Sequence, residues 1–301
     1  MRELERTLRC WHALGEPYAL ATVVAVTGSA PRELGAAMAV DAAGVAAGSV
    51  SGGCIEAEVY ELCREVLRTG RPVRRRYDSD PRDPFAPSLS CGGTLEVAIR
   101  RVDPATDAAV LPGLDAERDG RPRLLIFGAV EFAAALATAG GFLGYRVTVC
   151  DARPVFATPE RFPDAHEVVV EWPHRYLAAA TDLDRRTAVC VLTHDAKFDV
   201  PALAQALRSP AEYVGALGSR RTCAERVRRL REAGLGEAEL ARLRSPIGLD
   251  VGGTTPQEVA ISICAEIVAA TRGGTGLPLR DTFGPLHHRT RTTAPTTMAG
   301  V

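Results

Sequence analysis

The sequence lacks the features that mark membrane-spanning and secreted chains. No apolar run approaches the roughly 18 to 20 residues that a membrane helix needs. The first residues, MRELERTLRCWHALGEPY, spread charges along the chain and contain no apolar core of a signal peptide. Net charge is also nearly absent, with 36 basic and 37 acidic side chains. We therefore expect neither a membrane nor a nucleic acid as partner.

The sequence also lacks paired cysteines. Its eight cysteines are dispersed and form no CxxC spacing, which argues against both a zinc module and a disulfide scaffold. A reducing cytoplasm is the compartment that this usage favours, with most thiols packed in the core as small apolar groups. What remains is an ordinary globular composition, 46% apolar and 24% charged, in 301 residues. This length predicts two domains.

Residues 1–103 are predicted to form a small α+β domain. Apolar residues at helical spacing predict helices over residues 2–14 and 55–68, the second ending at Gly70. Strands are expected at 18–28, 38–40 and 45–50, and in the segments PVRRRYD and TLEVAIRR. The segment between the last two has three prolines within residues 81–87 and is predicted to be a loop.

A Rossmann-like domain is predicted after a linker at residues 104–122, which is rich in Pro, Gly, Asp and Ala. Over residues 123–272, continuous apolar strands alternate with helical segments. That pattern is typical of a doubly wound parallel sheet, so the overall fold class is α/β. Residues 273–301 are expected to form a tail of little order.

Two cysteines of the first domain have glycine neighbours. Gly52 and Gly53 precede Cys54 where a helix is predicted to begin. Successive N–H groups and the positive helix end favour an anion or a thiolate there, so Cys54 is a candidate nucleophile or soft metal ligand. Cys91, in SCGGTLEV, is a second candidate, and Arg32 is a candidate anion contact. The alternatives are gap-filling thiols and a solvated turn residue.

The second domain begins with an altered dinucleotide-binding fingerprint. Asp151 lies 23 residues after Gly128, about where a ribose-binding carboxylate belongs. The middle glycine of the motif is replaced by Val130, whose side chain obstructs a pyrophosphate, and Glu131 at the helix start repels phosphate. The fold signal is therefore strong, whereas the nucleotide signal is weak.

Three further loops hold candidate residues, and the first two follow predicted strands, where ligands of such sheets bind. His194 is a candidate general base, metal contact or cofactor contact, and capping of the next helix is its alternative. Gly218, Ser219 and Arg220 form a candidate anion site. The later arginines of the same helix, including Arg226, are expected to lie on a solvated face.

The third loop contains Asp250, Gly252 and Gly253, which are candidates for a pocket wall. Thr255 and Glu258 have the spacing of a capping box, so helix capping accounts for much of this loop.

These motifs together resemble the XdhC/CoxI family of molybdenum-hydroxylase maturation proteins. The resemblance extends over roughly residues 8–272. It rests on GSAPRELGAAMAV, GSVSGGCIEAEV, SCGGTLEV, CDARPVFATPERFPDA, LTHDAKFDVPAL, YVGALGSRRT and SPIGLDVGGTTPQEVAISICAEIVA, in that order. Many family members have a Gly-x-Gly-His loop where this chain reads Gly128-Ala129-Val130-Glu131, a departure that argues against nicotinamide chemistry here.

The resemblance implies a cytoplasmic homodimer that binds molybdenum cofactor and shields it while a cysteine desulfurase prepares its sulfurated form. The cofactor is then delivered to a xanthine-dehydrogenase-type or CO-dehydrogenase-type apoenzyme. A chaperone is thus favoured over a catalyst, with Cys54 contacting molybdenum or sulfur and the glycine loops holding the pterin phosphate. The competing hypotheses are an NAD(P)-dependent oxidoreductase and an adaptor that binds the hydroxylase alone.

Overall fold

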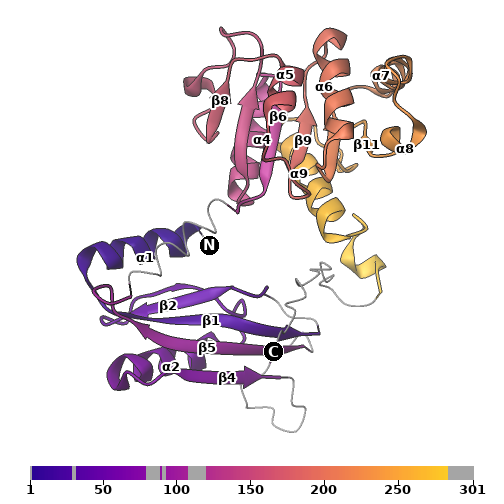
Figure 1. Ribbon diagram of the computed structural model, residues 1–301. Helices are drawn as coiled ribbons and strands as arrows, with labels where there is room; N and C mark the ends of the chain where they lie inside the picture. Colours follow the sequence, from indigo (N-terminus) through magenta and orange to yellow (C-terminus); the bar gives the residue numbers. More distant parts are fainter. Residues whose placement is uncertain (1, 29–31, 79–88, 90–92, 108–119, 284–301) are drawn as a thin grey trace, which may run out of the picture. The chain divides into compact units, whose positions relative to one another are not determined.

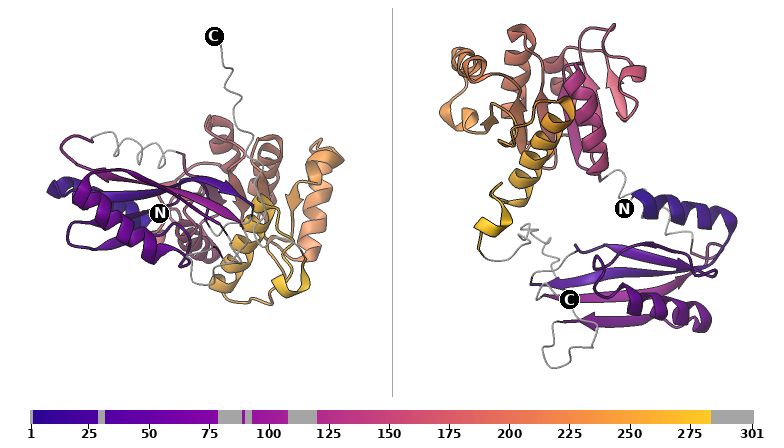
Figure 2. Two further views of the ribbon diagram at one scale, coloured as in Figure 1. Left: turned by 90° about the horizontal axis from the view of Figure 1, so that it is seen from below. Right: turned by 180° about the vertical axis from the view of Figure 1, so that it is seen from behind.

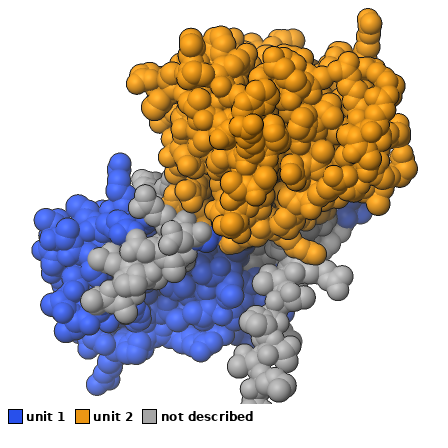
Figure 3. Space-filling view, turned by 45° about the horizontal axis from the view of Figure 1, so that its top comes forward, with its two compact units in different colours: residues 1–120, 283–288 blue, residues 121–282, 289–301 orange. Residues whose placement is uncertain are grey.

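The computed structural model describes residues 2–28, 32–78, 89, 93–107 and 120–283. The chain forms two compact units, one within residues 1–120 and the other within residues 121–282 (Figure 3). The predicted loop at 81–87, residues 108–119 of the predicted linker and residues 284–301 of the predicted tail lie outside the described residues.

The first unit is an antiparallel sheet with two helices (Figure 1). Its strands lie in the order β3-β2-β1-β5-β4. The elements are α1 (Arg2–Leu14), β1 (Tyr18–Thr27), β2 (Ala37–Asp41), β3 (Ala46–Gly48), α2 (Glu56–Thr69), β4 (Val73–Tyr77) and β5 (Thr94–Val102). The sequence predicted each of these elements to within a few residues, and Gly70 ends α2 in the left-handed conformation at φ 71°.

The two helices pack on opposite faces of this sheet. Ala19, Ala21 and Val23 of β1 share a core with α2, whereas Tyr18 shares a second core with α1. This alternation follows from the two-residue period of a strand. Figure 1 shows α1 and α2 on the two sides of the sheet.

The second unit is built on a six-stranded parallel sheet in the order β11-β10-β9-β6-β7-β8. Its strands are β6 (Arg123–Phe127), β7 (Arg146–Cys150), β8 (Glu167–Val169), β9 (Ala188–Val191), β10 (Tyr213–Ala216) and β11 (Leu243–Arg244). Numbered from β6, the order reads 3-2-1-4-5-6 from β8 to β11, which is that of the Rossmann fold. The predicted fold class is thus confirmed.

Helices cover both faces of the parallel sheet (Figure 2). α4 (Glu131–Phe142) and α9 (Pro256–Arg272) pack on one face. The other face is covered by α5 (Pro173–Ala179), α6 (Ala196–Arg208), α7 (Arg220–Glu232) and α8 (Glu237–Leu240). Two single 3₁₀ turns, η1 (Pro159–Arg161) and η2 (Leu279–Asp281), complete the described elements. Among the described helices, none combines the length and the apolarity needed to cross a bilayer.

Candidate functional site

The loop before α2 wraps around the carboxylate of Glu56. The backbone N–H groups of Ser51 and Gly52 donate to Oε1 at 2.8 and 3.0 Å, and that of Gly53 donates to Oε2 at 2.7 Å. The Ser49 hydroxyl donates to Oε1 at 2.6 Å, and the Ser51 hydroxyl donates to Oε2. The predicted amide cradle therefore exists, and it holds an anion that the chain itself supplies.

Glu56 is kept ionised by this cradle. Burial of the carboxylate would by itself raise its pKa, but the hydrogen bonds from Ser49, Ser51 and the loop amides outweigh that effect and lower the pKa to about 2. Sequence reasoning assigned the amides to an external anion or to a thiolate and missed Glu56. The available signal was an acid three residues after Gly53, the spacing at which a capping-box carboxylate reaches back to backbone N–H groups.

Cys54 lies at the exposed turn of this loop, next to buried Ile55, which anchors the start of α2. Cys63, Cys150, Cys190, Cys223 and Cys264 are buried, as the packing hypothesis predicts. Cys10 is exposed, so the expectation of core packing was wrong for that thiol. Arg32 is exposed, and Cys91 lies outside the described residues.

In the second unit, the turn after β6 is shaped by close backbone approach. Gly128 has φ +112°, and a Cβ atom there would lie 2.7 Å from Thr193 Cγ2 and 3.0 Å from the Thr193 nitrogen. A side chain at position 128 would therefore collide with Thr193 in the segment directly after β9, at the point where the strand order reverses.

Asp151, directly after β7, stabilises the same turn through hydrogen bonds of its carboxylate. Its Oδ2 accepts hydrogen bonds from the Ala129 N–H at 2.8 Å and from Arg153 Nη2 at 2.8 Å. Its Oδ1 accepts from the Arg153 backbone and from Nε, both at 2.9 Å. Burial acts to raise the pKa of Asp151, but the hydrogen bonds from Arg153 and Ala129 prevail and lower it. The structure thus gives this predicted ribose contact two partners within the chain.

At the carboxyl end of β9, His194 is exposed and Asp195 caps α6, accepting a hydrogen bond from the Lys197 N–H at 3.1 Å. The helix is therefore capped by Asp195, the residue after His194, and not by His194 itself. His194 lines a small cavity of about 170 Å³ between α6 and α7, together with Asp199, Arg226 and Arg229.

A buried ion pair borders that cavity, and sequence reasoning missed it. Arg226 Nη2 lies 2.8 Å from Asp199 Oδ2, and the two residues are each 3% exposed. Arg226 also donates to the Leu217 carbonyl at 2.9 Å and to Ser245 Oγ at 3.3 Å, while Thr193 donates to Asp199. The prediction that Arg226 lies on a solvated face was wrong, because its helical position faces α6 and not water.

The loop after β10 contains Gly218, Ser219 and Arg220. Ser219 is the N-cap of α7, and its Oγ accepts from the Thr222 N–H at 3.2 Å. Arg220 is exposed at the first position of that helix. A Cβ atom at Gly218 would approach Thr222 Cβ to 3.3 Å, so packing against the first turn accounts for this glycine.

The loop before α9 repeats the pattern of the Cys54 loop. The Thr254 and Thr255 N–H groups donate to Glu258 Oε2 at 2.9 and 3.0 Å, and Thr255 caps the helix, which confirms the predicted capping box. Asp250 and Gly252 are exposed, whereas Gly253 packs closely on Glu258. Here too, a carboxylate of the following helix accepts hydrogen bonds from backbone N–H groups of a glycine loop.

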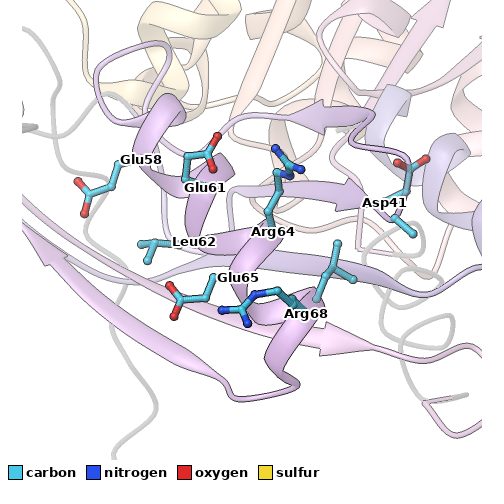
Figure 4. A pocket seen from close by; sticks show the side chains of 9 residues that line it. Asp41, Glu58, Glu61, Leu62, Arg64, Glu65 and Arg68 are labelled. Carbon is cyan, nitrogen blue, oxygen red and sulfur yellow. The ribbon is translucent and has the colours of Figure 1, made fainter.

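One further hollow, of about 730 Å³, lies beside α2 and contains none of the predicted site residues. Figure 4 shows Glu61, Arg64, Glu65 and Arg68 projecting from that helix, with Asp41 near them. Asp41 accepts a hydrogen bond from the Val45 N–H at 2.8 Å, which stabilises the turn between β2 and β3. Within the described part of the chain, no group of three or more His, Cys, Asp or Glu side chains is arranged to hold a metal ion.

Comparison with known sequences identifies the family. The model of the XdhC and CoxI family matches residues 11–78, which include the Cys54 loop, and the model of the XdhC Rossmann domain matches residues 124–267. The chain belongs to the XdhC and CoxI family. Both units are therefore family units, and the resemblance inferred from the motifs is confirmed.

Several relatives of this family member cover both units. The chain is 28% identical over 290 residues to the molybdenum cofactor insertion chaperone PaoD of Escherichia coli, covering 85% of this chain and 84% of PaoD. It is 26% identical over 316 residues to a Bacillus subtilis protein described as a probable xanthine dehydrogenase component, covering 84% of this chain and 93% of that protein.

Two other similarities are more limited in what they show. The chain is 32% identical over 260 residues to the uncharacterized protein YqeB of Escherichia coli, covering 86% of this chain but 44% of YqeB. It thus spans less than half the length of that relative. The crystal structure of a xanthine dehydrogenase from Bacillus halodurans has a TM-score of 0.74 at 24% identity, covering 97% and 98% of the two chains. This likeness supports the fold.

Proposed function

We propose that this protein binds molybdenum cofactor and inserts it into a molybdenum hydroxylase of the xanthine dehydrogenase type. The observation that carries the proposal is the extent of the match to PaoD, 85% of this chain and 84% of that chaperone. An overlap of that length includes residues of both units and is not confined to the Rossmann domain.

Within this proposal, Cys54 contacts the molybdenum or a transferable sulfur of the cofactor. Thiolates are ligands suited to soft metal centres and to sulfur exchange. Cys54 is exposed, and the residues before it are immobilised by their hydrogen bonds to Glu56. A thiol on a braced loop keeps its position when a large cofactor approaches, which lowers the entropy cost of binding.

Cofactor retention tests the role of Cys54. The protein is purified from a host that makes molybdenum cofactor, and molybdenum and pterin are measured by elemental analysis and by fluorescence of the oxidised pterin. We expect Cys54→Ala to reduce retention at least tenfold, because the soft contact is lost. Cys10→Ala is the matched control, since Cys10 is also exposed but lies on α1. Equal retention by both variants, or none by the wild type, would refute the proposal.

The pterin phosphate is proposed to lie at the carboxyl edge of the parallel sheet. Exposed Arg220 begins α7 there. The same unit also contains the Gly128 turn, His194 and the loop of Asp250, Gly252 and Gly253. Phosphate is favoured at helix N-termini and by guanidinium groups. These residues supply such groups within the second unit.

The proposed partners follow from the same function. An apo molybdenum hydroxylase receives the cofactor, and a cysteine desulfurase supplies sulfur while the cofactor is bound. A CO-dehydrogenase-type enzyme is an alternative recipient of the same cargo. We also propose that two copies of this chain associate.

The competing function is that of an NAD(P)-dependent oxidoreductase, which the Rossmann strand order favours. Two features of the first turn count against it. Asp151, the expected ribose partner, accepts hydrogen bonds from Ala129 and Arg153 on both oxygens. Val130 stands where a pyrophosphate requires glycine.

Titration calorimetry separates the two functions. We expect no saturable heat from NAD⁺, NADH, NADP⁺ or NADPH at up to about 100 times a micromolar Kd, a range in which a dinucleotide enzyme would be saturated. Binding in the micromolar range would instead support the oxidoreductase. A characterised NAD-dependent dehydrogenase titrated under the same conditions serves as the positive control.

A further inference from the structure

The carboxylate of Asp151 has its acceptor positions in use. An ionised carboxylate has two oxygens with about four lone-pair sites between them, so it accepts about four hydrogen bonds. Oδ2 accepts from the Ala129 N–H and from Arg153 Nη2, both at 2.8 Å. Oδ1 accepts from the Arg153 N–H and from Arg153 Nε, both at 2.9 Å. Asp151 is 3% exposed, so these donors leave almost none of it to water.

The Arg153 guanidinium places one N–H group on each oxygen of Asp151, and the backbone supplies the other donors. In dinucleotide-binding folds, the acid at the end of the second strand accepts a hydrogen bond from a ribose hydroxyl. Asp151 has that position, because it directly follows β7, the second strand of this unit. The two hydroxyls of a ribose would donate in the same pattern as the guanidinium, one to each oxygen. Arg153 therefore lies where those hydroxyls would have to bind.

Two further contacts fix Arg153 in this position. Its Cζ lies 4.6 Å from the centroid of the Phe156 ring, which is a cation–π distance. The Phe156 and Ala157 N–H groups donate to the Arg153 carbonyl at 3.0 and 3.2 Å. Exposed ion pairs contribute little in general, but a bidentate arginine–carboxylate pair is the exception. A neutral diol would replace bonds between two ions with bonds to one ion, so it displaces the guanidinium at a net cost.

A side chain without the guanidinium would leave Asp151 in place. Oδ2 would keep the Ala129 N–H, and Oδ1 would keep the backbone N–H of residue 153. One acceptor position on each oxygen would then open to water, because the Arg153 side chain that covers them is itself 45% exposed. The unit thus has a formed diol-binding carboxylate that one side chain closes.

We infer that Arg153 is the specificity-determining residue that excludes nucleosides from the carboxyl edge of the parallel sheet. Val130 obstructs the pyrophosphate of a dinucleotide but not a ligand without one. Arg153 extends the exclusion to every ligand that needs Asp151 as the acceptor of a ribose diol. This role is independent of the proposed cargo. For the cargo proposed above, it means that cellular nucleosides and nucleotides do not compete at that edge.

Adenosine binding to the full chain tests this role. Adenosine carries the ribose diol and no pyrophosphate, so Val130 does not affect the result. Binding is measured by saturation-transfer NMR of the ligand. We expect Arg153→Ala to lower the Kd for adenosine at least tenfold relative to the wild type, because it frees one acceptor position on each oxygen of Asp151. Arg153→Met, which keeps an unbranched stem without donors, should do the same.

The experiment has one control on the protein and one on the ligand. Arg161→Ala is the matched variant, since Arg161 is exposed and lies 5.4 Å from the Phe156 ring centroid, but its Nη1 donates to the Phe156 carbonyl and not to Asp151. It should bind adenosine as the wild type does. On the ligand side, 2′,3′-dideoxyadenosine lacks both hydroxyls and should show no gain with any variant. Circular dichroism verifies that the three variants are folded.

The outcomes are distinct. Tighter binding of adenosine by both Arg153 variants, without a gain for Arg161→Ala or for the dideoxy ligand, supports the assignment. Unchanged adenosine binding in both Arg153 variants overturns it. A gain that dideoxyadenosine shares also overturns it, because the hydroxyls are then not what Arg153 excludes. None of these results bears on cofactor retention by Cys54, so the two proposals fail separately.

Discussion

Arg226→Met is expected to lower the free energy of unfolding of the second unit by about 3–5 kcal/mol, the loss typical when one partner of a buried ion pair is removed. The reason is geometric. The Arg226 and Asp199 side chains are 3% and 5% exposed and 2.8 Å apart, so a charge left without its partner stays largely out of contact with water. The substitution leaves Asp199 as a buried carboxylate that keeps the Thr193 hydroxyl as a donor but has lost its counter-charge.

Denaturant unfolding followed by tryptophan fluorescence measures this loss. Trp172 reports on the second unit, where its ring lies 4.9 Å from that of Phe198, next to Asp199. A Trp11→Phe background removes the signal of the first unit. Because two units need not unfold together, the transition of each is fitted by itself.

Arg228→Met is the matched control for Arg226→Met. Arg228 lies on the same helix and pairs with Glu225 and Glu232, but its side chain is 58% exposed. An exposed pair contributes about 0–1 kcal/mol, so the control should unfold almost as the wild type does. The double substitution Asp199→Leu with Arg226→Met should recover most of the lost stability, since it removes both charges. Equal losses for Arg226→Met and Arg228→Met would contradict the buried-pair interpretation.

The second large effect is expected at Glu56. Glu56→Ala removes the acceptor of the backbone N–H groups of Ser51, Gly52 and Gly53. The positive partial charges of these converging N–H groups then repel one another, because no anion lies between them. Because Gly52 and Gly53 are exposed, water replaces part of the lost bonding, and we expect the loop to open more easily by about 1–3 kcal/mol.

Hydrogen exchange at the amides of residues 51–53 measures that opening. We expect exchange about 5- to 150-fold faster in Glu56→Ala, which corresponds to about 1–3 kcal/mol. Cofactor retention should fall with it, because Cys54 follows these residues directly. Glu61→Ala is the matched control, since Glu61 is exposed on the same helix outside the loop. Unchanged exchange in Glu56→Ala would show that the cradle is not held by this carboxylate.

The same carboxylate makes the loop sensitive to acid. The pKa of Glu56 is lowered to about 2 from an ordinary value of 4.5, so the ionised form is the one that the folded loop binds. Its stabilising effect is therefore complete above about pH 4.5 and is lost as the pH falls through the folded value near 2. Glu56→Gln should remove this pH dependence from the exchange of the loop amides, while retaining part of their protection through its amide oxygen.

The sequence alone predicted much of what this protein is. Apolar periodicity located the helices and strands, and the alternation of buried strands with helices after residue 123 indicated a parallel doubly wound sheet. These features are local and depend on spacing within one segment. The motifs around Cys54 and after each strand also led to the family. The Thr255–Glu258 capping box was predictable for the same reason, because both residues belong to one helical turn.

Only the tertiary structure decided which partner each functional group has. Arg226 looks like one of several arginines on an exposed helix until α6 places Asp199 against it. Spacing predicts Asp151 as a ribose contact, and only the fold shows that the Ala129 N–H and Arg153 bind its carboxylate. Hydrogen bonds and ion pairs depend on positions in space, and residues 22 or 27 apart in the chain are joined only by folding. Spacing along a segment determines secondary structure, whereas packing determines whether a charge meets water, a ligand or another side chain.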